Sequence, residues 1–309
     1  MFKGENTLKR NFIILGICFV LVLGLIVAGN IFKGQKNNSS KEKIVTSFYP
    51  MYIATSNIVA GIDNIELINL TSNSVGCIHD YTLTPHDMMN LSQAKVFIIN
   101  GSGMENFLQD VLNNYSELKI IDSSEGVHII RGHHENNSHT FVSINNYIVQ
   151  VKNIARELCE LYPQYKEELR QNANNYLKEL EGLKENIAKE LLDISNKKVV
   201  ALHDSFEYFA KDFGITVSTI IEEEEGAAVS ATEIAEIIKL IKMEGIKVIV
   251  VEKDSSTNTA EAIAKETGTV ICEFNASISG EYLSEQYIND MKFNVQNLVQ
   301  ALKGVNNNE

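Results

Sequence analysis

Residues Lys198–Ile221, KVVALHDSFEYFAKDFGITVSTII, contain one complete strand–helix–strand unit. Its two ends, KVVALH and ITVSTII, are short apolar runs rich in Val and Ile, a composition that is typical of buried strands. Between them, Ser205–Phe213 has the apolar spacing of an amphipathic helix. A helix between two strands predicts that the strands are parallel and that the helix covers one face of their sheet.

The same alternation of strands and helices continues on both sides of this unit. Downstream, the predicted strands are KVIVVEK and TVICEF, and the predicted helices are Ser230–Met243, Thr257–Thr267 and Glu281–Lys303. Upstream, the predicted strands are IVTSFY, IELINL, KVFIIN and LKIID, and the predicted helices cover Met51–Ile62, the segment from Thr84, and Gly103–Asn114. This order of elements predicts mostly parallel sheets that are covered by helices on both faces.

A long helical segment separates the two series of strands. Helical periodicity runs from Asn145 to about Asn196, and Pro163 is its one clear break. The second helix, from Pro163 to near Ser195, would span about 45 Å, which is enough to connect two lobes. The predicted fold is α/β, with two lobes that each hold a mostly parallel sheet flanked by helices and that are joined by a long rigid helix. Its predicted parts are a membrane segment and polar tether (1–43), a first lobe (44–160), the connecting helix (161–197) and a second lobe (198–305).

The N-terminus carries an apolar run of the length that crosses a membrane. Phe12–Phe32 is uncharged and follows three basic residues. About 20 apolar residues span a bilayer, so we predict an N-terminal helix that anchors the chain and leaves its bulk outside the cytoplasm. Val27–Gly29 also suits signal-peptide cleavage, after which the chain would be secreted.

The charge and the cysteines of the chain disfavour a nucleic-acid partner and a disulfide framework. The 309 residues are 44% apolar and carry a formal net charge of -13, which suits a globular chain and disfavours a nucleic-acid partner. Past the apolar run, Cys77, Cys159 and Cys272 have spacings that match neither a zinc knuckle nor a disulfide framework. Cys77 lies two residues from a histidine, so it is either a soft metal ligand or a small buried residue.

Three histidines, His79, His139 and His203, lie in three separated segments of the chain. His79 and His203 each follow an apolar run, and parallel-sheet proteins bind ligands at the carboxyl ends of their strands. Neutral imidazole is a preferred donor for zinc, and three imidazoles with one further oxygen complete a tetrahedron. The three histidines therefore predict a metal site that both halves of the chain contribute to.

Six motifs follow one another from His79 to the last predicted helix. They are HDYTLTPHDM, KVFIINGSGMENFL, a His-rich loop that ends in a single His, VVALHDSFEYFAKDFGI, KVIVVEKDSSTNTAEAIAKETG and YINDMKFNVQNL. In this order they resemble the metal-binding solute-binding proteins of ABC transporters for zinc and manganese, of the zinc-uptake type. The resemblance covers nearly everything from Ile44 onward. It implies two lobes hinged by one rigid helix, on the extracytoplasmic face of a bacterial membrane, that capture a metal in the cleft and deliver it to an ABC permease.

The resemblance also implies a set of metal ligands. It gives His79, His139 and His203 as three of them, with His134 as a competitor for the second position. Where similar sequences place an Asp or Glu, this chain has Asn275, whose amide oxygen is a weaker donor than a carboxylate. Three imidazoles without a certain carboxylate favour zinc over manganese.

The position of Asn275 leaves the fourth ligand open. The site holds three histidines and a water with a weak Asn275 contact, or it recruits Glu273 or Glu281, or its affinity has declined. Glu252, at the end of a strand, either receives a hydrogen bond from a ligating imidazole or pairs with a charge of the other lobe. The acidic run Glu222–Glu225 is either a solvated loop or a docking site for the permease.

Two other functional classes compete with metal capture. A three-histidine zinc site is also found in enzymes, but the chain has no HExxH, GxSxG, Gly-rich phosphate loop or CxxC pair, so an enzyme is not predicted. The second alternative is a degenerate relative that acts as an adhesin or regulatory binding protein without tight metal binding. The Asn275 substitution and the HTFVSI segment around His139 motivate it, because both depart from the pattern of similar sequences.

Overall fold

The computed structural model describes residues 41–71, 81–108, 115–131, 136–221 and 229–304. The chain divides into two units, Met1–Lys41 and Glu42–Glu309, and the account below concerns the second. The predicted membrane anchor, Phe12–Phe32, and the predicted tether up to residue 40 lie outside the described residues, whereas the last residues of that tether, from Glu42, belong to strand β1. Within the described ranges, no helix combines the length and the apolar character that a membrane span requires.

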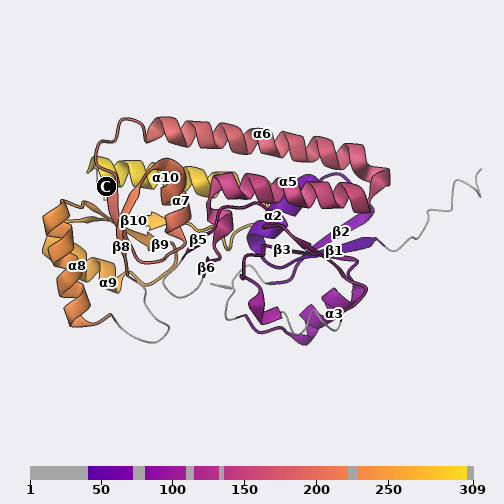
Figure 1. The fold of residues 1–309 in the computed structure, drawn as a ribbon, viewed down its shortest axis with the longest axis horizontal. Helices are drawn as coiled ribbons and strands as arrows, with labels where there is room; N and C mark the ends of the chain where they lie inside the picture. The colour runs from indigo at the N-terminus through magenta and orange to yellow at the C-terminus, as the bar shows by residue number, and fades with distance from the viewer. Residues whose placement is uncertain (1–40, 72–80, 109–114, 132–135, 222–228, 305–309) are drawn as a thin grey trace, which may run out of the picture. The chain divides into compact units, whose positions relative to one another are not determined.

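The first sheet has four parallel strands in the order β2-β1-β3-β4 (Figure 1). Its strands are β1 (Glu42–Thr46), β2 (Ile65–Asn69), β3 (Val96–Ile99) and β4 (Lys119–Asp122). The inner strands are apolar on both faces, and Ile44, Val45 and Phe97 are fully buried. This is the pattern of a parallel sheet covered on both sides.

Helices α2 (Tyr49–Ile58) and α3 (Pro85–Gln93) follow strands β1 and β2 in the chain. The start of α3 is fixed by its own sequence. The Thr84 hydroxyl accepts a hydrogen bond from the Asp87 amide, and the Asp87 carboxylate accepts one from the Thr84 amide. This reciprocal capping box, with Pro85 in the first turn, satisfies amides that have no partner inside the helix.

The second sheet repeats the topology of the first. Its order is β10-β9-β7-β8, all parallel, so the first strand of each sheet lies between the second and the third. The elements are β7 (Lys198–Ala201), α7 (Phe206–Phe213), β8 (Thr216–Ile220), α8 (Ala231–Glu244), β9 (Val248–Glu252), α9 (Asn258–Thr267) and β10 (Val270–Phe274). The α/β fold with two parallel sheets that the sequence predicts is confirmed.

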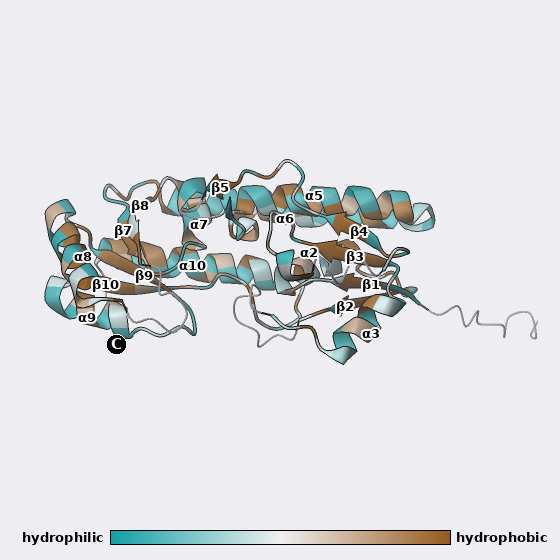
Figure 2. Ribbon diagram, turned by 60° about the horizontal axis from the view of Figure 1, so that its bottom comes forward, coloured by the Kyte–Doolittle hydropathy of each residue, from teal (hydrophilic) through white to brown (hydrophobic). Residues whose placement is uncertain are grey.

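Two of the three long helices, α5 (Ile144–Leu161) and α10 (Gln286–Lys303), pack against different parts of the third, α6 (Lys166–Glu190) (Figure 1). The short 3-10 turn η4 (Pro163–Tyr165) breaks the chain between α5 and α6. The buried residues of α6 recur every three or four positions: Leu169, Ala173, Tyr176, Leu180, Leu183 and Ile187. One face of α6 therefore packs along its whole length. Figure 2 shows both sheets in the hydrophobic colour and these helices with alternating colours.

Four details differ from the elements expected from the sequence. Helix α10 begins at Gln286, five residues later than expected, because the Glu281 carbonyl accepts a hydrogen bond from the Tyr49 hydroxyl. Helix α6 ends at Glu190, before the predicted end near Ser195. An unpredicted hairpin, β5 (Ile130–Arg131) and β6 (Asn136–Asn137), precedes His139. Of the expected helix Gly103–Asn114, the described part holds one 3-10 turn, η2 (Asn106–Leu108).

Candidate metal centre

The strand order sets where a ligand can bind. In the first sheet the chain leaves β1 toward β2 on one side and leaves β3 toward β4 on the other. In the second sheet it leaves β7 toward β8 and β9 toward β10 in the same way, so the strand order reverses between β1 and β3 and between β7 and β9. Open α/β sheets bind ligands at such reversals, outside the carboxyl ends of the strands. His203 comes two residues after β7, and Glu252 is the last residue of β9. Both side chains are therefore placed at the reversal of the second sheet.

Two of the predicted ligands, His139 and His203, lie against each other. Their ring centroids are 5.0 Å apart and the ring planes are inclined by 81°. His139 precedes the 3-10 turn η3 (Thr140–Val142) and is only 6% exposed, whereas the His203 side chain is 35% exposed. Residues more than 60 positions apart in the sequence are thus brought together with one imidazole buried and one open to solvent.

Asp204 lies between the two imidazoles, and the sequence did not single it out. Its Oδ1 is 3.3 Å from Nδ1 of His139 and 3.2 Å from Nδ1 of His203. Within the described ranges, these three residues form a group whose ligand atoms all lie within 4.8 Å of one another. Two imidazoles and a carboxylate are donors that suit zinc. The available signal was the position of Asp204, directly after a predicted ligand at a strand end.

The orientation of His139 is set by Asn137. The Asn137 amide nitrogen donates to the Asp204 carbonyl at 2.9 Å, so its Oδ1 is the acceptor that lies 3.1 Å from Nδ1 of His139. Because that oxygen only accepts, the contact is a hydrogen bond in the tautomer that carries its proton on Nδ1. The same Oδ1 accepts the His139 backbone amide at 3.1 Å. In that tautomer, Nε2 of His139 is the ring nitrogen whose lone pair could bind a metal.

His203 is held by the residues that follow it and by strand β9. The Ser205 amide donates to Nδ1 of His203 at 3.1 Å, and Oε1 of Glu252 lies 3.4 Å from the same nitrogen. The Ser205 hydroxyl in turn donates to Oε1 of Glu252 at 2.5 Å. The ring is therefore fixed by a polar cluster that joins the ends of β7 and β9.

A small cavity of about 10 Å³ adjoins the two imidazoles. That volume is about the space that one water molecule needs, and so it suits a single bound ion. Among the described residues, the lining apart from His139, His203 and Glu252 is apolar, and it comes from both lobes: Phe48, Met104, Phe141 and Ile278. Apolar walls lower the local dielectric and strengthen any bond between a cation and its ligands.

The side chain of Asn275 has other partners in this structure. Its amide nitrogen donates to Asp290 at 3.0 Å and its Oδ1 accepts the Ser277 amide at 2.8 Å. Asn294 holds the Asn275 backbone through two further hydrogen bonds. Burial raises the pKa of the Asp290 carboxyl. Asn275 therefore ties the end of β10 to α10, and its predicted contact with a metal stays a prediction.

The remaining candidate ligands either lie outside the described residues or are exposed and do not line the cavity. Three of them, His79, His134 and Cys77, lie outside the described residues. The side chains of Glu273 and Glu281 are exposed and do not line the cavity. His86 and His128 are also exposed, His86 beside Asn90 and His128 beside Lys211.

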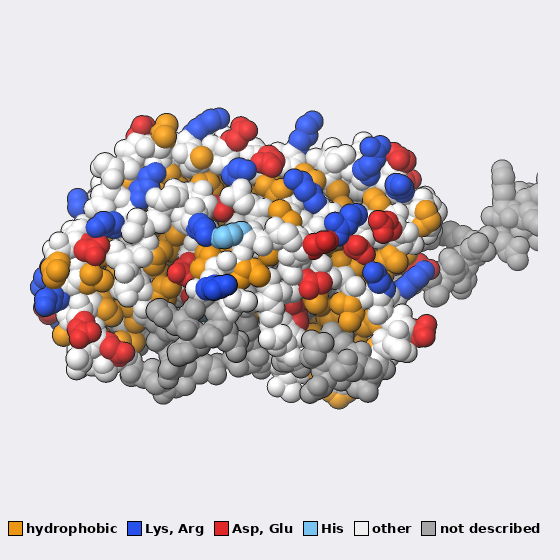
Figure 3. All heavy atoms as spheres, viewed as in Figure 1, with side chains coloured by type: hydrophobic (Ala, Val, Ile, Leu, Met, Phe, Trp, Pro, Cys, Tyr) orange, Lys and Arg blue, Asp and Glu red, His pale blue; other side chains and the backbone are white. Residues whose placement is uncertain are grey.

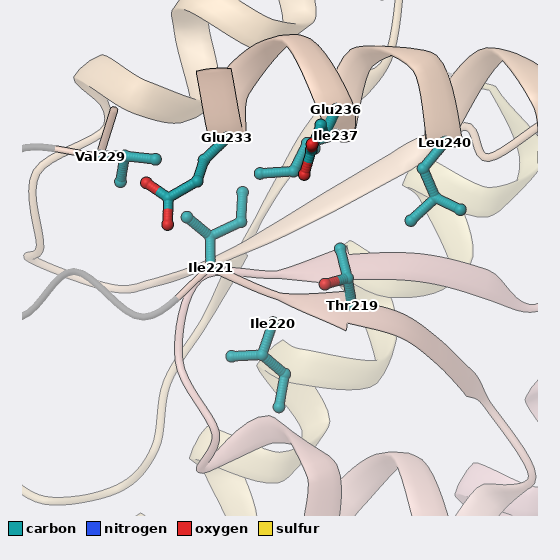
Figure 4. A pocket seen from close by; sticks show the side chains of 8 residues that line it. All are labelled: Thr219, Ile220, Ile221, Val229, Glu233, Glu236, Ile237 and Leu240. Atoms are coloured by element: carbon teal, nitrogen blue, oxygen red, sulfur yellow. The ribbon is translucent and has the colours of Figure 1, made fainter. Parts of the chain in front are cut away.

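A larger groove of about 390 Å³ lies beside the edge strand β8 (Figure 4). It is lined mainly by apolar side chains of β8, α8 and the residues next to them: Ile220, Ile221, Val229, Ile237 and Leu240. One of its carboxylates, Glu233, caps the start of α8 by accepting the Ser230 amide at 2.9 Å. The acidic run Glu222–Glu225 lies outside the described residues, so its predicted role in docking stays a prediction.

Charged side chains of both signs are interspersed on the molecular face that Figure 3 shows. This face offers no extended basic area to a phosphate backbone, which agrees with the net charge of -13.

Known proteins with similar sequences bind metals. The zinc-binding protein AdcA of Streptococcus pyogenes is 28% identical over 254 residues, which cover 74% of this chain but only 49% of AdcA. The chain thus spans about half the length of that relative. The high-affinity zinc uptake system protein ZnuA of Bacillus subtilis is 26% identical over 313 residues and is covered to 96%. The solute-binding protein FpvC of Pseudomonas aeruginosa, solved in complex with Mn²⁺, superposes with a TM-score of 0.76 at 25% identity, covering 85% of this chain and 99% of that one.

A family-wide comparison gives the same assignment over most of the chain. The model of the ZnuA family, described as "Zinc-uptake complex component A periplasmic", matches residues 44–301. The match includes both sheets, the three long helices and the paired imidazoles described above. The chain therefore belongs to the ZnuA family of zinc-uptake complex components, as the order of its six motifs predicts.

Proposed function

We propose that this chain captures one divalent metal ion, zinc, beside His139 and His203 and delivers it to an ABC permease. The pairing of these two imidazoles at a cavity of single-ion size is the observation that carries the proposal. His79 is proposed as the third ligand, and Asn275 or a water molecule as the fourth. Membership of an uptake family also supports the prediction that the chain is a binding component and not an enzyme.

The paired imidazoles favour zinc over manganese, although the Asp204 carboxylate beside them is a donor that suits manganese too. Imidazole nitrogen is a borderline donor that suits zinc, whereas manganese prefers carboxylate and carbonyl oxygen. The relatives that are named as zinc-binding proteins support the same choice, while the manganese complex of FpvC shows that this fold also accommodates manganese. We propose the extracytoplasmic face of a bacterial membrane as the location, with Phe12–Phe32 as anchor or cleaved signal.

Metal content tests the capture step. The full chain, purified in detergent without a His tag, is expected to hold one zinc per chain by elemental mass spectrometry and to compete with a chelator for it. His139→Ala and His203→Ala each remove one donor and the tight binding with it. His86→Ala and His128→Ala remove exposed imidazoles outside the cavity and should leave the affinity unchanged. Unaltered affinity in the first pair contradicts the assignment.

The same titration separates the proposal from its alternative. A folded wild-type chain that holds no metal tightly would favour a degenerate relative that acts as an adhesin or regulatory binding protein.

Delivery is tested in the native bacterium. A strain without this chain should take up radioactive zinc more slowly at low zinc concentration. Wild-type chain should restore the rate, whereas the His139→Ala/His203→Ala double variant should not. Equal rescue by both would contradict delivery through this site.

A further inference from the structure

The loop that follows β3, Asn100–Glu105, has one fixed conformation. Gly101, Ser102 and Gly103 all have positive φ, at 79°, 56° and 93°. A Cβ atom on Gly101 would lie 1.9 Å from Oδ1 of Asp122, so only glycine fits there. A non-glycine residue in this region is strained, and such strain persists only where surrounding contacts hold it.

Glu105 supplies those contacts from inside the loop. Its buried carboxylate accepts the backbone amide of Asn100 at 2.7 Å and that of Gly101 at 3.0 Å, and it accepts the Ser47 hydroxyl at 2.7 Å. Successive amides around an anion form a nest, which holds the backbone in place. The loop therefore presents the Asn100 side chain in a set direction.

That side chain reaches the residues on both sides of His139. Nδ2 of Asn100 donates to the Ser138 carbonyl at 3.0 Å, and Oδ1 accepts the Thr140 hydroxyl at 3.1 Å. Gln150 donates to the same Oδ1 at 2.8 Å. Asn100 is 0% exposed, so no water competes for these bonds in the native fold.

We infer that Asn100 is a positioning residue that fixes the backbone of His139 and thereby aims its imidazole at the metal cavity. Its importance for metal affinity rests on the proposed function, but its effect on His139 does not. Replacing Asn100 by Asp keeps the acceptor for Thr140 and Gln150 but sets a carboxylate oxygen against the Ser138 carbonyl. The two hydrogen bonds that Asn100 makes on either side of His139, with Ser138 and Thr140, form a bracket. Asn100→Asp loses the bond to Ser138, and the His139 ring is then expected to become mobile and more accessible.

Thr140→Val removes the other side of the bracket with little change in volume. It leaves the bond from Asn100 to Ser138 in place, so its effect should be smaller and in the same direction. This second variant keeps the inference testable if Asn100→Asp does not fold.

Asn153 provides the matched control. It is 6% exposed and its amide donates to the carbonyls of Ser123 and Glu125 at 2.8 and 2.7 Å, so it fixes the loop after β4 in the way that Asn100 fixes His139. Asn153→Ala therefore removes two buried hydrogen bonds to backbone carbonyls without touching the bracket. A general loss of stability should appear in this variant as well.

The experiment compares these full-length variants with and without metal. In metal-free protein, mass spectrometry follows the rate at which diethyl pyrocarbonate modifies His139, and that rate should rise in Asn100→Asp but not in Asn153→Ala. With metal, Asn100→Asp should lose up to roughly 10- to 100-fold in zinc affinity, the range seen when a residue hydrogen-bonded directly to a metal ligand is replaced. The visible absorption of bound Co²⁺ should also change, because the ligand geometry is altered.

The outcomes separate the inference from the proposed function. Equal modification rates at His139 in Asn100→Asp, Thr140→Val and Asn153→Ala would overturn the inference, whatever the metal does. A wild-type chain without zinc would overturn the proposed function, while the modification rates would still decide whether Asn100 positions His139.

Discussion

Glu105 is a single residue whose ionisation is linked to folding. Its carboxylate is fully buried, and burial raises its pKa to about 7, with a further increase from Asp122 and opposing hydrogen bonds from Ser47, Asn100 and Gly101. The ordinary value is 4.5, so between about pH 4.5 and 7 the folded chain binds this proton more tightly than the unfolded chain does. The contribution of Glu105 to stability is therefore fully present below pH 4.5 and is lost as the pH rises through 7.

Glu105→Gln should remove this part of the pH dependence. From pH 4.5 to 8 the wild-type free energy of unfolding is expected to lose on the order of 3 kcal/mol through Glu105, because one pKa unit corresponds to about 1.4 kcal/mol. The variant should lack that decrease, and the control Glu66→Gln, at an exposed site, should keep it. Urea denaturation across this pH range measures the difference. Parallel pH profiles of wild type and Glu105→Gln would contradict the linkage.

At the residue scale, the sequence could predict which imidazoles meet but not what surrounds them. His203 ends an apolar run, which places it at the carboxyl edge of a sheet, and His139 is named as a ligand only through the order of the motifs. Asp204, Asn137 and Asn100 act through distances of about 3 Å that arise only when segments far apart in sequence pack together. Side chains of such common types carry no periodicity that would mark them in advance.

At the scale of elements, helix α5 is capped by a residue of α7. The Ser143 side chain accepts the Asn146 amide, and its hydroxyl donates to the Asp212 carboxylate at 2.9 Å. Asp212 also accepts the Asn145 amide at 3.1 Å and the Asn145 side chain at 2.7 Å. A carboxylate at a helix N-terminus satisfies free amides and interacts favourably with the helix dipole. The two helices are therefore fastened to each other next to His139.

Asp212→Ala should detach the start of α5 from α7. Loss of hydrogen bonds to a charged group is expected to lower the free energy of unfolding by about 1–3 kcal/mol. Asp193→Ala removes an exposed carboxylate and serves as the control. Equilibrium urea unfolding measures both variants. A loss in free energy of unfolding for Asp212→Ala no larger than that for Asp193→Ala would show that Asp212 does not hold the helix.

Most elements could be predicted because their signals are local. Strands appear as apolar runs and helices as periodic ones, and the capping boxes at Thr84 and Ser230 are visible in sequence. The hairpin β5–β6 could not be found, since its strands have two residues each and are fixed by contacts of Tyr208 with Ile130 and Asn137. The late start of α10 likewise depends on a contact with distant Tyr49.

At the scale of the whole described unit, one hydrophobic cluster joins both sheets. It includes Ile44 of β1, Leu180 of α6 and Val248 of β9. Between them, the rings of Tyr147 and Tyr287 are stacked with centroids 3.8 Å apart. A continuous core of this kind favours a single cooperative unfolding transition over two separate ones.

Leu180→Ala therefore should weaken both sheets together. Deleting this fully buried side chain is expected to cost about 2–5 kcal/mol. Hydrogen exchange read by mass spectrometry should show faster exchange in the strands of both sheets, while the exposed control Lys178→Ala shows none. Faster exchange in one sheet alone would indicate that the lobes unfold independently.

The overall architecture was accessible from sequence because two series of alternating elements flank one long helical segment. The shared strand order of the two sheets was not, since neither sheet's order is encoded by any local pattern. The division into residues 44–160, 161–197 and 198–305 stays a prediction.

The small volume beside His139 and His203 has a consequence for competing cations. A space of about 10 Å³ holds about one water molecule, so an ion that binds there is expected to exchange part of its hydration shell for protein ligands. Mg²⁺ releases its water reluctantly, and Ca²⁺ needs about six to eight oxygen ligands, more than the carboxylates of Asp204 and Glu252 supply beside the two imidazoles. We therefore expect the cost of dehydration to disfavour these hard cations at this cavity.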